Sequence, residues 1–199
     1  MSSIDPIPPK TGVRHIDLFV GGCALLVSVV SLFMAWQSNH TQERMLAASV
    51  WPYMSWGTNN IDQNGQDEIS FNLYNLGVGP AKIESLQLLY KGQPVANGRA
   101  LVAACCQEQV AALKDLKDMD LRTAGINPIV LPGHDSMKFF MLPKKQANAA
   151  LWEALDRERL NILIRTCYCS VLEECWQDEP GHAQPHSVRR CEVLESQYH

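Results

Sequence analysis

The sequence predicts a mainly β protein with helical insertions, in which an N-terminal transmembrane helix precedes a small β-sandwich domain. Three observations lead to this prediction. An apolar run occupies residues 16–36, several short segments after residue 50 have strand character, and all but one of the seven cysteines lie in that later part. Because the two helical segments interrupt the strands and do not alternate with them, a doubly wound α/β fold is excluded.

The apolar run from Ile16 to Trp36 contains a single charge, Asp17, at its edge. The hydrocarbon core of a bilayer, about 30 Å thick, needs roughly 20 apolar residues in a helix, because unpaired backbone groups are costly in lipid. Trp36 lies at the end of the run, and an indole prefers the membrane interface. The run therefore predicts a transmembrane helix at residues 16–36, with the lipid bilayer as a partner.

Two alternatives to a spanning helix stay open. A cleaved signal peptide has a shorter apolar core followed by a small-x-small site, and no clean site of this kind lies between Phe33 and Asn39. A helix buried in a soluble domain is usually shorter or two-faced.

Small residues in membrane helices often pack against a partner helix. Here the candidates are Gly21, Gly22, Ser28 and Ser31.

Three further regions surround the run. Residues 1–15 contain several prolines and few apolar side chains, which predicts a flexible N-terminal tail. Residues 37–49 hold good helix formers, so we expect the helix to continue as a helical stalk until Pro52 ends it. Residues 50–199 are expected to form one disulfide-containing β-sandwich domain.

Strands and helices are expected in mixed order within this domain. Hydrophobic alternation marks Glu68–Asn75 as a strand, and Asn64-Gly65 predicts a hairpin turn before it. In the connection that follows, Gly77 and Gly79 are expected to supply positive φ. The remaining predicted strands are Val50–Trp56, Ala81–Tyr90, Ser136–Leu142, Asn161–Val171, Cys175–Gln177 and Val188–Leu194, the helices are Gly98–Asp118 and Gln146–Arg159, and the loops are Asn127–Asp135 and Gly181–Pro185.

One combination of motifs resembles a known class. An anchor and stalk are followed by Asn75-Leu-Gly-Val-Gly-Pro-Ala81 and by a late Cys-Tyr-Cys-Ser…Glu-Cys-Trp hairpin. This combination is similar to that of uncharacterised bacterial single-pass membrane proteins. The resemblance covers residues 16–90 and 160–191 and implies an immunoglobulin-like extracytoplasmic domain. It implies no activity and no cofactor, and the helix around Cys105 is an insertion relative to a minimal sandwich.

Six cysteines follow the anchor, and an even number there predicts disulfides in an oxidising compartment. Cys169 and Cys175 flank a short turn between strands, so they are the first candidate pair. Cys191 is then the expected partner of Cys167, although six cysteines allow 15 connectivities. Cys23, inside the apolar run, is expected to act as a small apolar residue.

Cys105 and Cys106 are adjacent in a predicted helix. Neighbouring side chains of a helix diverge by about 100°, so each cysteine is expected to find a separate partner. A direct bridge between them is expected to be strained.

A metal site is the alternative use of the C-terminal cysteines. Cys175, Cys191, His182 and His186 offer sulfur and nitrogen donors, and soft thiolates favour zinc or copper(I). The spacing matches no established zinc pattern, since C-x₂-C does not occur. A redox-active pair at Cys167-x-Cys169 is a further alternative, but catalytic thiols usually lie at a helix N-terminus and this pair is on a strand.

Enzymatic signatures are lacking. The sequence contains no G-x-S-x-G, H-E-x-x-H or S-x-x-K motif. Asp115, Asp118 and Asp120 alternate with lysines, as on a solvated helix face, and His134-Asp135 has the character of a turn. A net charge of −4 without a basic patch excludes nucleic acid as a partner. We therefore expect no catalytic residues and no cofactor.

The sequence thus predicts a membrane-anchored extracytoplasmic binding or interaction protein, for example an accessory subunit of a membrane complex. Lys10 and Arg14 before the run, against Arg44 after it, favour a cytoplasmic N-terminus. The cysteines favour a periplasmic domain at a bacterial inner membrane, with a membrane or periplasmic protein as partner. The alternative is a thiol-redox or metal-handling protein, and a reversed orientation with reduced thiols is the third hypothesis.

Overall fold

The computed structural model describes residues 14–126, 128–192 and 197–198. The chain divides into two compact units, Met1–Leu46 and Ala47–His199. The predicted tail, residues 1–15, lies almost entirely outside the described residues. In order, the elements are α1 (Arg14–Ser49), β1 (Met54–Ile61), β2 (Asp67–Asn75), β3 (Ala81–Tyr90), β4 (Gln93–Val95), α2 (Gly98–Ala111), η1 (Leu116–Met119), β5 (Arg122–Thr123), β6 (Ile129–Leu131), β7 (Ser136–Pro143), η2 (Gln146–Asn148), α3 (Ala149–Glu158), η3 (Arg159–Asn161), β8 (Ile162–Cys169), β9 (Cys175–Asp178) and β10 (His186–Val188).

The first unit is dominated by α1, one unbroken helix of 36 residues. Its most apolar window has a mean hydropathy of 2.4 and no residue of that window is buried. Among the described residues it is the one helix long and apolar enough to cross a membrane. The helix continues through the predicted stalk and ends at Ser49, before Pro52, as a proline after the last turn requires.

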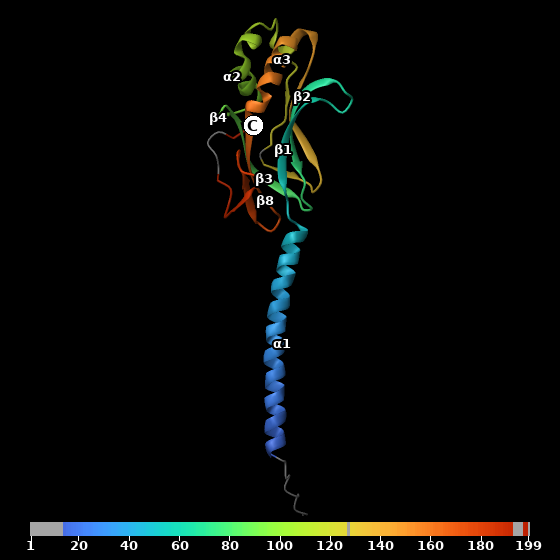
Figure 1. Ribbon diagram of the computed structural model, residues 1–199, viewed down its shortest axis with the longest axis vertical. Coiled ribbons are helices and arrows are strands. Elements are labelled where there is room, and N and C mark those ends of the chain that lie inside the picture. Colours follow the sequence, from blue (N-terminus) through green and yellow to red (C-terminus); the bar gives the residue numbers. More distant parts are fainter. Residues whose placement is uncertain (1–13, 127, 193–196, 199) are drawn as a thin grey trace, which may run out of the picture. The chain divides into compact units, whose positions relative to one another are not determined.

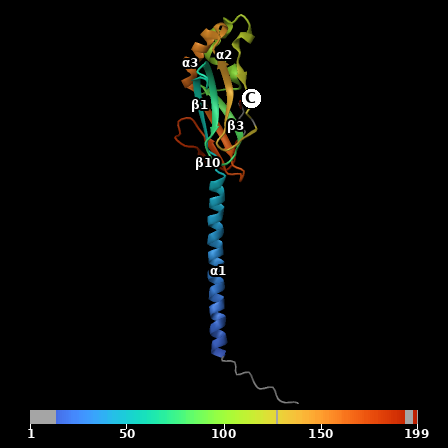
Figure 2. The same ribbon diagram turned by 90° about the vertical axis from the view of Figure 1, so that its right-hand side faces the viewer.

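Two antiparallel sheets make up most of the second unit (Figure 1). The first has the strand order β1-β2-β7-β5. The second has the order β10-β9-β8-β3-β4, and β6 pairs with β3. The helices α2 and α3 contact each other and lie together at one end of the sheets in both views (Figure 1, Figure 2).

The sheets share one hydrophobic core. Phe71 of β2 and Phe140 of β7, on the first sheet, meet with ring centroids 5.0 Å apart. Tyr198, close to the end of the chain, links both sheets: its amide donates to the carbonyl of Leu86 on β3, and its hydroxyl donates to the carbonyl of Phe139 on β7. Burial raises the pKa of Tyr198 to about 12. Tyr198 was not among the residues that hydrophobic periodicity identifies, because it follows no strand pattern.

Asn75 organises the connection between β2 and β3. Its side-chain amide donates to the carbonyls of Gly79, Leu131 and Pro132 at 2.8, 3.1 and 3.0 Å. Its side-chain carbonyl accepts from the amides of Gly77 and Tyr53. One fully buried asparagine therefore joins three segments that lie far apart in the sequence.

The predicted reason for Gly77 and Gly79 is wrong. Neither glycine has positive φ; among the described glycines, positive φ occurs at Gly65, Gly92 and Gly181. At Gly77 a Cβ would collide with the backbone of residues 51–53, and at Gly79 with the carbonyl of Val50. These positions need glycine because two backbones approach closely, not because of a turn conformation.

Several predicted boundaries also change. The strand expected from Val50 begins only at Met54, because the carbonyls of Trp51 and Tyr53 accept from the amides of Gly79 and Leu76 in the loop and not from a neighbouring strand. The helix expected over Gly98–Asp118 ends at Ala111. The strand expected over Val188–Leu194 is in fact β10, His186–Val188, and part of the predicted range, residues 193–194, lies outside the described residues.

Candidate functional site

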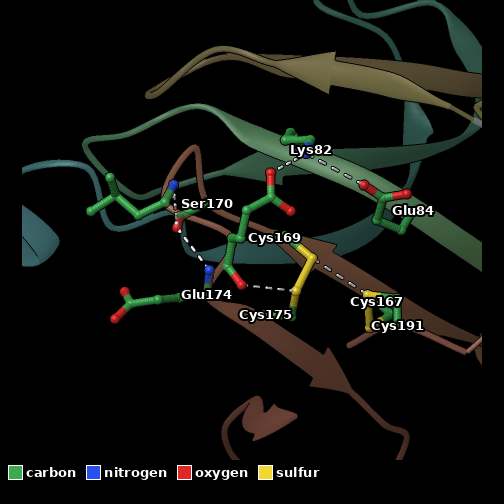
Figure 3. A network of polar contacts seen from close by, with 10 residues as sticks. Lys82, Glu84, Cys167, Cys169, Ser170, Glu174, Cys175 and Cys191 are labelled. Carbon is green, nitrogen blue, oxygen red and sulfur yellow. Dashed lines mark hydrogen bonds and ion pairs between the residues drawn. A yellow bond between two sulfur atoms is a disulfide. The ribbon is translucent and has the colours of Figure 1, made fainter. Parts of the chain in front are cut away.

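The cysteines of β8 and β9 gather on one face of the second sheet (Figure 3). Side chains alternate along a strand, and Tyr168 belongs to the hydrophobic core. Its neighbours Cys167 and Cys169 therefore project from the opposite face, away from the first sheet. Cys175 is the register partner of Cys169 on β9 and shares that face.

Cys169 and Cys175 form a disulfide across the β8–β9 hairpin, with their Cα atoms 4.0 Å apart. The turn between them is shaped by Ser170, whose amide donates to the carbonyl of Glu174 at 2.8 Å. The Ser170 hydroxyl accepts from the amides of Leu172 and Glu174. Serine in this role is typical of tight turns, and it holds the two cysteines in register.

Cys167 forms the second disulfide, with Cys191, across 24 residues of sequence. This bond ties the segment after β10 to the central strand β8. The sequence predicts both pairings, and the structure places both bonds.

The two disulfides touch. Sγ of Cys169 lies 3.8 Å from Sγ of Cys191, and the sulfurs of Cys169, Cys175 and Cys191 all lie within 4.8 Å of one another. Cys167, Cys169 and Cys175 are buried, whereas Cys191 is partly exposed. A thiolate arriving from solvent therefore reaches Cys191 first, because thiol–disulfide exchange needs access to the attacked sulfur. Sequence spacing does not reveal this contact, since it depends on the path of the C-terminal segment.

A lysine beside the cluster is neutralised by carboxylates. Lys82 is the register partner of Cys169 on the neighbouring strand β3. Its ammonium group lies 2.8 Å from the Glu173 carboxylate. The carboxylate of Glu84 lies 3.9 Å from it on the other side (Figure 3 labels Lys82 and Glu84). The hydrogen bond to Glu173 raises the pKa of Lys82. With two carboxylates around it, this ammonium group is poorly placed to stabilise a thiolate.

The predicted metal set, Cys175, Cys191, His182 and His186, requires correction. Zinc and copper(I) bind thiolates, and both of these cysteines are held in disulfides with other residues. His182 and His186 lie close together, with ring centroids 6.0 Å apart, and both are exposed. In its disulfide-bonded state the set offers no thiolate ligand.

Cys105 and Cys106 do not find separate partners, as was expected, but are bonded to each other. The reason lies in the backbone: Cys106 has φ −138° and ψ 38°, which interrupts the regular helix within α2. The 100° divergence of neighbouring helical side chains therefore does not apply at this point. The sequence offered one indication of this bond: if the other four cysteines after the anchor pair among themselves, Cys105 and Cys106 are the two that remain.

The small residues of α1 do not share one face. At about 100° per residue, Gly21 and Ser28 nearly coincide around the helix, whereas Gly22 and Ser31 point in opposite directions. The Ser28 hydroxyl donates to the carbonyl of Ala24 at 2.8 Å, so it is satisfied within its own helix. Helix packing through these residues stays a prediction. Cys23, also on α1, is a free cysteine.

Comparisons with protein-family models, with curated proteins and with solved structures find no match to this chain.

Proposed function

We propose that this protein is a membrane-anchored binding protein, with its N-terminus in the cytoplasm and its disulfide-bonded domain in the periplasm of a bacterium. In this proposal it acts through the surface of that domain, as an interaction partner or accessory subunit of a protein complex at the inner membrane. One observation carries the proposal: a domain with three disulfides follows a helix that is long and apolar enough to span a bilayer.

The exposure of α1 supports the anchor. A core helix of a soluble domain buries its apolar side chains, but large apolar residues of α1 such as Leu18, Leu25, Val30 and Leu32 are between 59% and 75% exposed. So much apolar surface is stable in lipid and costly in water. The continuous helix also extends well past residue 36, which favours a retained anchor over a short signal peptide.

The disulfides support the orientation. Structural disulfides persist in the periplasm and are rare in the bacterial cytoplasm, where thiols are kept reduced. All three bonds lie on the C-terminal side of the anchor. If the domain is periplasmic and the helix crosses the membrane once, the N-terminus is cytoplasmic.

The strand order supports an immunoglobulin-like sandwich. In that fold strands A-B-E-D form one sheet and G-F-C-C′ form the other. When β6 and β10 are left out and the other strands are lettered along the chain, the orders β1-β2-β7-β5 and β9-β8-β3-β4 have this arrangement. The chain departs from antibody domains in its bridges, since Cys169–Cys175 joins the F-like and G-like strands of one sheet and not the two sheets. The sandwich implies no particular function by itself, so the proposed binding role rests on the anchor and the disulfides.

A reporter fusion tests the placement. Alkaline phosphatase fused after the last residue is expected to be active, because it folds only where its own disulfides form. A fluorescent protein that folds only in the cytoplasm, fused at the same point, is the matched control and is expected to be dark. An inactive phosphatase fusion together with a bright fluorescent fusion, both at full expression, would overturn the proposed orientation.

The partial exposure of Cys191, one half of the Cys167–Cys191 bond, favours thiol exchange as a second candidate function. A protein dithiol would attack Cys191, breaking its bond to Cys167 and releasing the Cys167 thiolate. The mixed disulfide then resolves by the second thiol of that reductant, which becomes oxidised while Cys191 is released. Mass spectrometry after alkylation of the protein as isolated separates the candidates. Three intact bridges in the whole population support the structural reading, and a partly reduced Cys167–Cys191 pair supports exchange.

A further inference from the structure

Four aromatic side chains line a small cavity in the second unit. The cavity has a volume of about 120 Å³, and its walls are Trp51, Tyr53, Tyr168, Trp176, Gln184 and Pro185. This is several times the space needed for one water molecule. It lies apart from the cysteine cluster, because Tyr168 and Trp176 project from the core-facing side of the second sheet.

Backbone pairing holds the rings in place. Tyr168 and Trp176 are register partners on β8 and β9, and their rings stack with centroids 6.0 Å apart. Trp51 and Tyr53 flank Pro52 in the extended segment before β1, with ring centroids 5.5 Å apart. Their carbonyls accept from the loop amides of Gly79 and Leu76. The walls are therefore preorganised, which lowers the entropy cost of binding a ligand.

A carboxylate lies on the same strand as Trp176, although it does not line the cavity. Asp178 follows Trp176 by two residues on β9, so both side chains share one face of the strand. Burial raises the pKa of Asp178, while the nearby His182 opposes this shift. The charge of Asp178 also contributes, after burial, to raising the pKa of the cavity residue Tyr168 to about 12. Among the described residues, Asp178 forms no ion pair within 4.0 Å.

We propose that this cavity binds a methylated ammonium cation, such as the trimethylammonium group of choline. Aromatic faces carry negative quadrupole charge and attract cations that are large and weakly hydrated. Asp178 does not itself line the cavity, but its negative charge acts on the lining residue Tyr168, and Gln184 is the one polar side chain of the wall that is not aromatic. The inference rests on the proposed binding function for its use in the cell, and it names the ligand class of that function.

A neutral apolar group is the competing occupant. Aromatic walls also accept a proline or an aliphatic side chain. Such a group would remove water from the Asp178 carboxylate and return no charge, and burying an uncompensated charge is costly. Two ligands of the same shape, one cationic and one neutral, therefore distinguish the two kinds of occupant.

Choline and its neutral carbon isostere, 3,3-dimethylbutan-1-ol, make this comparison. We would titrate each into the purified full-length protein in a maltoside detergent and follow tryptophan fluorescence and heat of binding, with sodium chloride matching the ionic strength. Choline is expected to bind saturably and at least about 10-fold more tightly than the isostere. Equal affinities, or no saturable binding of choline, would overturn the proposal.

Two variants locate the binding. Trp51→Ala removes a ring that is 44% exposed and is expected to weaken choline binding about 5- to 10-fold. Asp178→Asn is expected to weaken choline about 5-fold and to leave the isostere unchanged. Tyr74→Ala, which removes a half-buried aromatic outside the cavity, is the matched control and is expected to bind as the native protein does. Equal losses in all three folded variants would overturn the site.

Nanodiscs distinguish a lipid headgroup from a free cation. If the ligand is the phosphatidylcholine headgroup, nanodiscs of that lipid compete with free choline and raise its apparent Kd relative to phosphatidylglycerol nanodiscs. If the apparent Kd of choline is equal in the two kinds of nanodisc, the ligand is a free methylated ammonium compound and not the lipid headgroup. Because neither measurement depends on which side of a cell membrane the domain occupies, failure here is distinct from failure of the reporter fusions.

Discussion

Sγ of Cys169 lies 3.8 Å from Sγ of Cys191, although the two atoms belong to different disulfides. Each sulfur therefore has one covalent partner and one neighbour within reach of exchange. Exchange conserves electrons, because an attacking thiolate forms one bond while another thiolate leaves. The cluster is thus able to reach a second connectivity without a net change in oxidation state, once one of its thiols is free.

Freeing one thiol is expected to reveal that second connectivity. In the variant Cys167→Ser, the Cys191 thiolate is expected to attack Cys169, and the electron pair of the broken bond leaves on Cys175. A mixture of Cys169–Cys175 and Cys169–Cys191 bonds should result, measured by peptide mapping after acid quenching and alkylation. Native protein is the control. A population with Cys191 entirely free would contradict the expected exchange.

The two bridges are expected to differ in their contribution to stability. Bonds that close longer loops restrict the unfolded chain more. With separations of 24 and 6 residues, the Cys167–Cys191 bond should contribute about 3.5 kcal/mol and the Cys169–Cys175 bond about 2 kcal/mol. Urea unfolding of the two double-alanine variants measures this difference. The reverse order of stability would show that native-state effects outweigh loop closure.

Asn75 is expected to be critical for folding. Asn75→Ala removes the donor to three carbonyls in the connection between the sheets. Leaving buried polar groups unpaired costs about 1–3 kcal/mol each, so a loss of at least about 2 kcal/mol in the free energy of unfolding is expected. Asn59→Ala, at an exposed position of β1, is the control and should change stability by less than about 0.5 kcal/mol. Similar losses in both variants would contradict the role of Asn75.

Asp120 is expected to give a pH-dependent contribution. Its carboxylate lies 2.7 Å from the Lys145 ammonium group, whose hydrogen bond lowers the pKa of Asp120 below the ordinary value of 3.8. A carboxyl with a lower pKa in the folded state stabilises above its unfolded pKa, and this stabilisation disappears as pH falls through the folded pKa. Lys145→Met should therefore lose up to about 1 kcal/mol at pH 7, and this loss should shrink as the pH is lowered toward 2.

Urea midpoints of the native protein and of Lys145→Met, measured at both pH values, test this expectation. Asp120→Asn is a suitable second variant, because Asp120 has φ 49° and asparagine tolerates that left-handed conformation. A difference between Lys145→Met and the native protein that is as large at pH 2 as at pH 7 would assign the effect to packing of the lysine stem and not to charge.

Local patterns in the sequence anticipated much of the fold. Alternation of apolar residues located the strands around Phe71, and the short turn after Cys169 anticipated a cross-strand pair. The apolar run located α1, because length and composition alone predict a helix of this kind. In each of these cases the relevant contacts lie within a few residues or follow from one periodicity.

Contacts between distant segments were decided only by the tertiary structure. Trp51 and Tyr53 are not part of a strand, because their carbonyls accept hydrogen bonds from amides of a loop some 25 residues later. Position 79 requires glycine, because the backbone of Val50 lies against it. The contact of Cys191 with Cys169 and the aromatic cavity were likewise decided only by the tertiary structure. The sequence by itself determined which segments are apolar, extended or capable of pairing. Which of them meet was decided by packing around one shared core, because close approach depends on the whole chain path and not on local periodicity.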